Sequence, residues 1–360
     1  RMPVGLAAMS VKRLTTLKTT VATLWLALSF AATCGQTAWC AEVSLKGAGS
    51  TFASLLYKKW IEGYRSAAPS VSISYDAVGS GEGIARFTAA TVDFAGSDVL
   101  MSDSETAKVH NGVVMVPTTA GMIALAYNLP GVKGELKLPR DVYADIFAGV
   151  IKRWDDTRIR DANPGVTLPH LDIVLVARLD ASGTTSVFTE HLAAIKPNWR
   201  QLGMGVGKII QWPAGTMLAS GSEALAARIK MSEGAIGYAE YGFPKRLGLP
   251  MATLQNKAGK FVAPSASSGQ VALASPTPPP LRDLAASAVD PAAPGAYPIV
   301  TYSWIAINRR YTDAAKGTAL REFLDWGLSR GQDDGVDLGY VPLTTGVISL
   351  GKQALGAAGL

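Results

Sequence analysis

The chain has 360 residues, the length of about two average domains. Hydrophobic residues make up 48% of it and charged residues only 17%, against a usual ~25%, which excludes an intrinsically disordered chain. With two cysteines and three histidines, the sequence argues against a disulfide scaffold and against a metal site built from these residues, and we expect neither a metal nor a cofactor.

The first 41 residues have the order of a secretory signal peptide. Basic residues at 12–18 precede an apolar run at 21–32, and a stretch of small and polar residues ends at Ala41. The apolar run is shorter than the ~20 residues of a membrane span, so we expect cleavage and export, in a bacterium to the periplasm. An uncleaved anchor and lipid attachment at Cys34 or Cys40 remain alternatives.

The basic charge of the chain belongs largely to this leader. Removing residues 1–41 takes away four basic residues and lowers the net charge from +6 to +2. Nucleic-acid binding, which needs a clustered basic face, therefore loses most of its support.

From Glu42 onward, strand-like and helix-like runs alternate along the chain. Apolar positions at helical spacing, and short β-branched runs between turns, predict the elements. The expected strands are 43–52, 71–78, 91–98, two strands within 113–128 around a break at 118–121, 171–180, 234–242 and 299–308. The expected helices are 52–67, a short one containing Ile84 and Phe87, 141–156, 181–195 and 319–329. This alternation predicts an α/β protein with mainly parallel sheets.

The composition changes between residues 264 and 298, which are rich in proline, serine and alanine. We interpret this segment as a surface excursion, with room for a short helix at 285–289, and not as a domain.

Three glycine-rich turns each lie between a predicted strand and a predicted helix: residues 47–52 (GAGSTF), 79–83 (GSGEG) and 180–188 (DASGTTSVF). At such a turn the first N–H groups of the helix have no partner within the helix, and the helix dipole places positive charge there. One turn of this kind is a common helix start. Three in one chain, each with serine or threonine, indicate an anion-binding site.

Two charged features lie at the ends of predicted buried strands. Arg178 and Asp180 project to the same side because they are two residues apart on a strand, and open α/β sheets bind ligands at this end. A purely structural ion pair is the alternative. Asp98 ends another strand in the same way, and its alternative role is to cap the helix that starts near Ser102.

Several enzyme and nucleotide-binding motifs are absent or incomplete. The first turn lacks the third glycine of a dinucleotide fingerprint, and the chain contains no P-loop sequence. Ser182 is flanked by A-S-G and not by the G-x-S-x-G of an esterase, and His191 lies inside a predicted helix. His110 and His170 are expected in loops without a role. We therefore expect no catalytic residue, although an exported serine phosphatase or esterase remains the alternative of a different class.

The strings GAGSTF, TVDFAGSD, IKRWDD, RLDASGTTSVFT and GAIGYAEY together resemble the periplasmic high-affinity phosphate-binding proteins of the phosphate-specific ABC transporter, the Pst system. The likeness runs from about Leu45 to Asn308, and more loosely to Leu343. It implies a class II-like periplasmic binding protein fold, in which two α/β lobes joined by two hinge strands close on one phosphate. It implies no enzyme activity.

The same resemblance implies the ligand-binding residues, position by position. Asp98 would accept the proton of the phosphate, and Arg178 would pair with both the anion and Asp180. The implied set is Thr51, Phe52, Ser80, Asp98, Arg178, Asp180, Ser182, Gly183 and Thr184. Two features depart from the family: Glu82 stands where a small residue is usual, close to the anion site, and the segment 264–298 replaces a stretch that is often helical.

We therefore expect one lobe at about 42–120 plus 299–360 and the other at 121–298, with hinge strands near 119–121 and 297–298. The implied partners are inorganic phosphate and the permease subunits and ATPase of the transporter. We expect a monomer that binds no nucleic acid. The same fold binding another oxyanion such as sulfate, and a role in sensing or scavenging, are the remaining alternatives.

Overall fold

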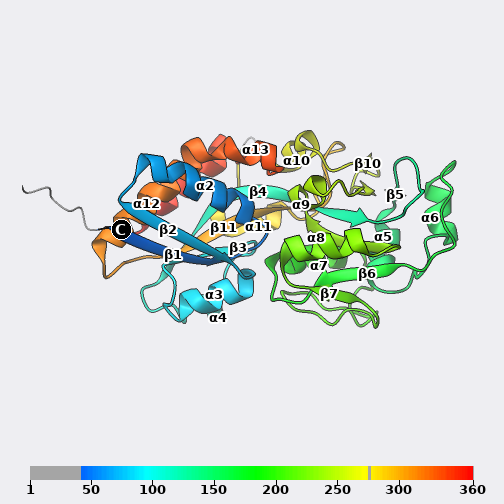
Figure 1. Ribbon diagram of the computed structural model, residues 1–360, viewed down its shortest axis with the longest axis horizontal. Helices are drawn as coiled ribbons and strands as arrows, with labels where there is room; N and C mark the ends of the chain where they lie inside the picture. Colours follow the sequence, from blue (N-terminus) through cyan, green and yellow to red (C-terminus); the bar gives the residue numbers. More distant parts are fainter. Residues whose placement is uncertain (1–41, 275–276, 360) are drawn as a thin grey trace, which may run out of the picture. The chain divides into compact units, whose positions relative to one another are not determined.

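The computed structural model describes residues 42–274 and 277–359, so the expected signal peptide lies outside the described residues. These residues form one large sheet and one small sheet, covered by helices (Figure 1). The strands are β1 (Val43–Gly49), β2 (Val71–Ala77), β3 (Phe94–Ser97), β4 (Val113–Tyr127), β5 (Lys137–Leu138), β6 (Val174–Arg178), β7 (Met217–Ala219), β8 (Ala235–Glu240), β9 (Thr253–Gln255), β10 (Phe261–Val262) and β11 (Val300–Asn308).

Most of these strands are followed by a helix, as the alternating pattern of the sequence predicts. The helices are α2 (Ser54–Ala67), α3 (Ser80–Thr88), α4 (Asp103–Thr106), α5 (Arg140–Phe147), α6 (Thr157–Ala162), α7 (Gly183–Ile195), α8 (Gly221–Met231), α9 (Gly242–Arg246), α10 (Ala266–Leu273), α11 (Leu281–Ser287), α12 (Ala314–Ser329), the 3-10 turn η1 (Arg330–Gln332), α13 (Asp334–Leu338) and α14 (Thr345–Ala357). The prediction of an α/β protein is confirmed.

The large sheet has eight strands in the order β2-β1-β3-β11-β4-β8-β6-β7, and β10-β9-β5 form the small sheet. Strands β1, β2 and β3 run parallel, as do β6, β7 and β8, whereas β11 and β4 are antiparallel to their neighbours. We call β2, β1, β3, β11 and the first part of β4 the first half of the sheet. The second half is the rest of β4 with β8, β6 and β7.

Strand β4 joins the two halves without a break. Its residues 113–122 pair with β11, and its residues 123–127 pair with β8. The expectation of two strands around 118–121 is therefore wrong. The residues at 118–121 lie just before the place where β4 exchanges β11 for β8 as its partner. A register shift opposite Ser303 and Trp304 also marks a β-bulge there. Pro117, which has no N–H to donate, lies beside this bulge.

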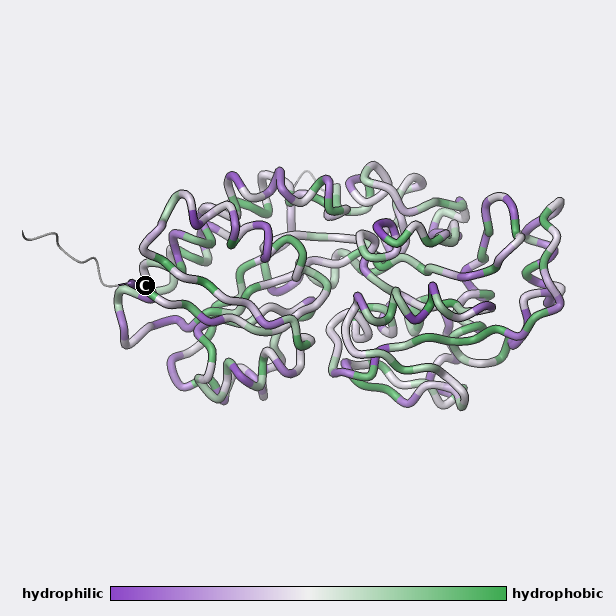
Figure 2. The backbone as a smooth tube through the Cα atoms, viewed as in Figure 1, coloured by the Kyte–Doolittle hydropathy of each residue, from purple (hydrophilic) through white to green (hydrophobic). Residues whose placement is uncertain are grey.

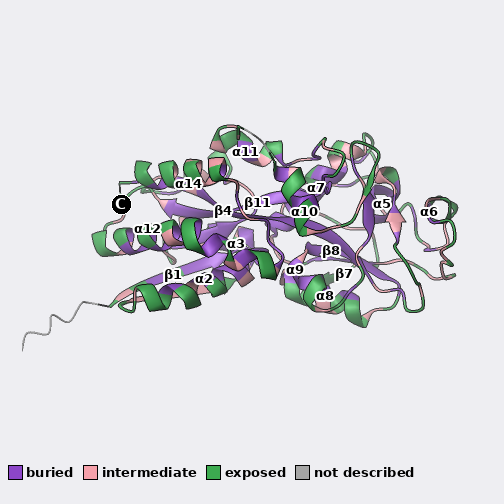
Figure 3. Cartoon of the chain, turned by 90° about the horizontal axis from the view of Figure 1, so that it is seen from above, coloured by how far each residue is buried: buried purple, intermediate pink, exposed green. Residues whose placement is uncertain are grey.

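Apolar side chains fill both faces of the sheet. Helices α2 and α12 pack against each other through Trp60 and Tyr64 on one and Phe323 on the other, and α8 packs Leu225 on the second half. Figure 2 shows hydrophilic residues mainly on helices and outer loops, and Figure 3 shows buried strands between helices with exposed outer faces.

The helix expected at 141–156 is shorter in the structure. Helix α5 ends at Phe147, and Gly149 adopts a positive φ of 71° just beyond it, the common way for a helix to end. Asp156 then begins α6, because its side chain accepts a hydrogen bond from the N–H of Arg158 at 2.9 Å.

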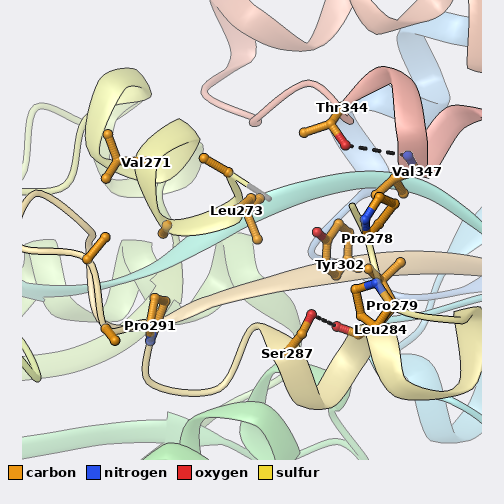
Figure 4. Close-up of a pocket in the computed structure, with 14 residues that line it drawn as sticks. Val271, Leu273, Pro278, Pro279, Leu284, Ser287, Pro291, Tyr302, Thr344 and Val347 are labelled. Carbon is orange, nitrogen blue, oxygen red and sulfur yellow. Dashed lines mark hydrogen bonds between the residues drawn. The ribbon is translucent and has the colours of Figure 1, made fainter. Parts of the chain in front are cut away.

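The segment 264–298 also differs from the expected surface excursion. It holds two helices, α10 and α11, and buries several side chains: Leu273, Leu284, Ala288, Ala296 and Tyr297. Figure 4 shows Pro278, Pro279 and Leu284 close to Tyr302 of β11, around a pocket of about 260 Å³ that α14 also lines. The many prolines and serines of the segment 264–298 therefore mark the helix starts and turns of a packed segment.

Candidate anion-binding site

Four helices begin at one place, beside the carboxyl ends of the parallel strands. Helix α2 follows β1, α3 follows β2, α7 follows β6 and α8 follows β7. Ligands bind at this end of open α/β sheets, and the N-termini of helices favour negative charge. The three glycine-rich turns supply three of these starts. The fourth helix start, at Gly221, was missed by sequence reasoning because the pair Ser220-Gly221 is typical of an ordinary turn.

Asp98 lies at the centre of this region, directly after β3, and is 2% exposed. Its Oδ1 accepts hydrogen bonds from Ser50 Oγ at 2.5 Å and from Ser303 Oγ at 3.0 Å. Its Oδ2 accepts one at 3.1 Å from Thr184 Oγ1, in helix α7, which follows β6 of the second half of the sheet. Burial raises the pKa of Asp98, although the three hydroxyls and the charge of Arg178 act to lower it.

Hydrogen bonds from the described residues use three of the acceptor positions of the Asp98 carboxylate. A carboxylate has about four lone-pair positions, two on each oxygen. Both positions of Oδ1 are occupied by hydroxyls, and Oδ2 receives one hydroxyl. The carboxylate can therefore accept one more hydrogen bond, from a group that carries a proton.

The alternative role of Asp98 as a helix cap is excluded by the local geometry. Ser102 caps α4: its side chain accepts from the N–H of Glu105, and the Glu105 side chain accepts from the N–H of Ser102. This capping box is complete without Asp98.

Arg178 and Asp180 form an ion pair at the end of β6. Arg178 Nε donates to Asp180 Oδ1 at 2.7 Å, and Arg178 Nη2 donates to Asp180 Oδ2. The N–H of Gly221 donates to Asp180 Oδ1 at 2.9 Å. Burial acts to raise the pKa of Asp180, but the bonds and charge of Arg178 outweigh it and the pKa is lowered. Asp180 thus remains ionised and holds the guanidinium in place, while Nη1 of Arg178 reaches Ser222 Oγ at 3.5 Å.

The first turn places Thr51 toward the second half of the sheet and Phe52 into the core. Thr51 Oγ1 lies 3.0 Å from Ser222 Oγ. The Phe52 ring is fully buried beside Tyr340, and the Phe52 N–H donates to Ser50 Oγ at 3.1 Å. The hydroxyl of Thr51 is thus at the site, whereas the contribution of Phe52 to a ligand stays a prediction.

The second and third turns touch each other. The N–H of Gly81 donates to the carbonyl of Ala181 at 2.8 Å. Gly79 has a φ of 93°, and a Cβ there would lie 2.3 Å from Asp180 Oδ2. A Cβ on Gly183 would lie 2.5 Å from Ser80 Oγ, so this close approach requires glycine. Ser80 Oγ in turn accepts from the N–H of Asp98 at 3.3 Å.

Ser182 has the role of a helix cap. Its Oγ accepts from the N–H of Thr185 at 3.1 Å, at the start of α7. His191 is buried on the same helix and its Nε2 is 2.8 Å from the hydroxyl of Tyr143. Burial lowers the pKa of His191 to about 4. The histidine that a hydrolytic Ser182 would need is thus bonded elsewhere.

Glu82 turns away from the anion residues. Its side chain is 51% exposed and accepts from Arg86 Nε at 2.8 Å, one helical turn further along α3. Its negative charge is therefore paired on the surface, at the start of a helix where carboxylates are favourable.

One ion pair links the two halves of the sheet beside these turns. Lys208 Nζ lies 2.6 Å from Glu105 Oε1, and both side chains are about one-quarter exposed, at 21% and 28%. Glu105 belongs to α4 in the first half, and the carbonyl of Lys208 accepts from the N–H of Ser182 in the second. The pair therefore bridges the same two regions as Thr184 and Asp98.

Sequence reasoning missed three serines of the site: Ser50, Ser222 and Ser303. Ser50 stands within the quoted GAGSTF turn, so its presence was visible but its bond to Asp98 was not. Ser303 lies inside a buried strand next to the β-bulge, and its hydroxyl donates to Asp98. A serine in a buried strand was the available signal.

Two further findings concern the described residues alone. In the ranges 42–274 and 277–359, no cluster of three or more His, Cys, Asp or Glu side chains is placed to hold a metal ion. Over the same part of the chain, every helix is too short or too polar to span a membrane.

The amino-acid sequence matches a known family and several known proteins. Residues 29–330 match the family model described as PBP superfamily domain. The chain is 35% identical over 308 residues to the phosphate-binding protein PstS of Xylella fastidiosa (strain Temecula1), covering 85% of this chain and 83% of that protein. It is 35% identical over 312 residues to that of Haemophilus influenzae, covering 86% and 92%.

Solved structures agree on the fold. A high-affinity periplasmic phosphate-binding protein, PfluDING bound with phosphate, has a TM-score of 0.70 at 23% identity, covering 85% of this chain and 92% of that one. The phosphate-binding protein of Stenotrophomonas maltophilia has a TM-score of 0.65 at 20% identity, covering 86% and 93%. The fold is the two-lobed α/β fold of periplasmic binding proteins. The chain therefore belongs to the PBP superfamily, and within it to the family of phosphate-binding proteins PstS.

Proposed function

We propose that this protein captures inorganic phosphate in the periplasm and delivers it to the permease subunits of an ABC transporter, whose ATPase drives import. The names of the relatives support the ligand and the transport role. The observation that carries the proposal is the carboxylate of Asp98, which keeps one free acceptor position inside a cluster of helix N-termini.

A carboxylate in an anion site is unfavourable unless the ligand donates a proton to it. Like charges repel strongly where water is excluded. Phosphate near neutral pH keeps at least one O–H group, and the free position on Asp98 would accept its hydrogen bond. Sulfate has no O–H at that pH, so it would meet the repulsion without the bond. This reasoning favours phosphate over the alternative of sulfate.

The remaining groups of the site would bind the ionised oxygens. Arg178 would supply positive charge and Asp180 would hold it in place. The N–H groups at the starts of α3 and α7 and the hydroxyls of the turns would supply uncharged donors. The proposed ligand-binding set is Thr51, Phe52, Ser80, Asp98, Arg178, Asp180, Ser182, Gly183 and Thr184.

We also propose that the two lobes close around the ligand. One lobe would comprise 42–120 with 299–360, and the other 121–298. The change of partner in β4, from β11 to β8 after residue 122, supports a hinge there. Bonds such as Thr184 to Asp98 cross between these lobes, so an anion that binds both would favour the closed state. We propose a monomer, exported by a cleaved signal peptide.

The alternative of a serine phosphatase or esterase has little geometric support. Ser182 Oγ is used as a helix cap, and His191 is bonded to Tyr143. We propose that the protein has no catalytic activity. An assay for hydrolysis of a phosphate monoester should show no turnover above a blank, and turnover that Ser182→Ala abolishes would contradict the proposal.

Calorimetric titration of the purified mature protein with phosphate and with sulfate tests the binding function. We expect one phosphate site per chain and no sulfate binding at the same concentrations. Sulfate binding as tight as phosphate binding would assign the site to another oxyanion. Absence of phosphate binding would overturn the proposal.

A further inference from the structure

The start of helix α8 touches both sides of the anion site, although no motif of the sequence marked it. Ser222 is 1% exposed and stands at the second position of α8. The neighbouring Gly221 has a φ of 80° and lets the chain approach Thr51, because a Cβ there would lie 3.3 Å from Thr51 Cγ2. α8 therefore begins against the first turn of the other lobe.

We propose that Ser222 is a positioning residue, which orients the Thr51 hydroxyl so that its proton points at the bound anion. This inference rests on the proposed function, because it assigns a further residue to the same phosphate site.

Three contacts meet at Ser222. Its backbone N–H donates to Thr51 Oγ1 at 3.2 Å, and its Oγ lies 3.0 Å from the same Thr51 Oγ1. On the other side, Nη1 of Arg178 donates to Ser222 Oγ over 3.5 Å, at the outer limit of a hydrogen bond. Ser222 thus stands between the cation of one lobe and a hydroxyl of the other.

The direction is fixed for the bonds from the Ser222 N–H and from Arg178, and the proposal assigns it for the hydroxyl pair. A guanidinium can only donate, so Arg178 occupies one lone pair of Ser222 Oγ, and either hydroxyl of the Ser222–Thr51 pair can donate to the other. The proposal places the Ser222 proton on Thr51, because only this direction leaves the Thr51 proton free for an anion. Thr51 Oγ1 then accepts two hydrogen bonds, from the N–H and the O–H of Ser222. A hydroxyl has two acceptor positions and one proton. Thr51 is left with its proton alone, as a pure donor.

A donor-only Thr51 complements Asp98 on the other side of the site. Thr51 would require an ionised ligand oxygen, whereas Asp98 would require a protonated one. The chain from Arg178 through Ser222 to Thr51 also polarises each bond in the same direction, which strengthens it. Without the Ser222 hydroxyl, Thr51 regains an acceptor position and its proton is no longer directed.

Release of phosphate, followed by stopped-flow fluorescence, tests this role. Ser222→Ala should release phosphate about three- to tenfold faster than the parent, the range expected for one neutral hydrogen bond. Ser220→Ala is the matched control, because Ser220 is an exposed serine at the same helix start and makes no side-chain cap bond. The control should release phosphate at the parental rate.

A double-mutant cycle separates orientation from general damage. Thr51→Val should accelerate release strongly in the parent but less in Ser222→Ala, where the threonine proton is already misdirected. Ser222→Ala also removes buried hydrogen bonds, so a lower unfolding midpoint of its ligand-free form is expected, and the coupling in the cycle decides the inference. Effects of the two substitutions that simply multiply, or parental release by Ser222→Ala, would overturn the inference while leaving the proposed function intact. Failure of the parent to bind phosphate would overturn the proposed function itself.

Discussion

The two carboxylates of the proposed anion site lie in opposite lobes, as we propose to divide the chain, and in opposite environments. Asp98 receives bonds only from uncharged hydroxyls, and burial raises its pKa. Asp180 is paired with Arg178 and with the N–H of Gly221, and its pKa is lowered. The same residue type is therefore poised to accept a proton-bearing ligand in one lobe and to orient a cation in the other.

This contrast explains how a site for an anion can contain two acids and one arginine. The charge of Asp180 is balanced by Arg178, so it adds little repulsion toward a ligand. The charge of Asp98 is only dispersed over hydroxyl donors, so in the proposed site it would repel any ligand that brings no proton. Selectivity would thus reside in the first lobe and much of the affinity in the second.

Removal of the Asp98 charge should give the largest effect, on selectivity. A site built around one hydrogen bond of its ligand can reject an analogue without it by ~10⁴-fold. We expect Asp98→Asn to bind sulfate measurably and to keep phosphate affinity within about tenfold of the parent, because the amide oxygen still accepts a bond. Competition titrations of phosphate and sulfate measure this ratio.

Asp103→Asn is the control for this experiment, since it removes the same charge from an exposed position on α4. It should leave the ratio of the two affinities unchanged. Equal ratios in Asp98→Asn and the parent would mean that Asp98 does not discriminate between the anions.

Loss of the arginine should weaken phosphate binding at least ~30-fold, or about 2 kcal/mol. Arg178→Ala removes charge-assisted bonds to the ligand, and it also leaves Asp180 unpaired in a largely buried position. Calorimetry compares it with Arg160→Ala, an exposed arginine of α6. An Arg178→Ala affinity within threefold of the parent would show that uncharged donors dominate.

The two carboxylates should also change stability with pH in opposite directions. The raised pKa of Asp98 means that its contribution to stability is present at low pH and is lost as pH rises from about 3.8 through its folded pKa. The lowered pKa of Asp180 gives a contribution present above about 3.8, which is lost as pH falls through its folded pKa. Each slope is at most about 1.4 kcal/mol per pH unit.

Urea unfolding of the ligand-free proteins between pH 3 and pH 7, a range of about four units around the carboxyl values, checks these signs. Relative to the parent, Asp98→Asn should gain stability as pH rises, and Asp180→Asn should lose it. Slopes of the same sign would contradict the contrast between the two environments.

The smallest effect is expected from the ion pair between Lys208 and Glu105. Surface pairs are worth about 0–1 kcal/mol, so Lys208→Ala should speed phosphate release no more than about fivefold. The acceleration should shrink in high salt, which screens the pair in the parent. Lys59→Ala, an exposed lysine on α2, should leave release unchanged. Acceleration that is independent of salt would assign Lys208 a packing role.

Most strands and helices could be predicted because their apolar periodicity is local. The helix over 141–156 could not, because the apolar Ile151 and Trp154 continue the pattern although the chain leaves the helix and buries Trp154 in a loop. The continuity of β4 was equally hidden. Its polar Thr118 and Thr119 suggest a break, yet they are buried against β11, whose position depends on residues far along the chain.

The site shows the same division between local and distant information. The turns at 47–52, 79–83 and 180–188 contain the glycine, serine and threonine residues that predict a helix start. A helix begins at or after each of these turns. Ser222 has no local signal, and Ser303 has only that of a serine in a buried strand, because both reach the site through a pairing of segments that are remote in sequence. Glu82 pairs with Arg86, one helical turn later, so the contact that holds its side chain is local in sequence.

The position of β11 has a consequence for how the chain acquires its structure. β11 lies between β3 and β4 in the sheet but occupies Val300–Asn308, so the first half of the sheet stays incomplete until most of the polypeptide has been synthesised. Until then β3 and β4 present unpaired edges, and closing so distant a contact is slow. A topology that is completed this late in the chain is compatible with translocation before folding, and so with the export that we propose.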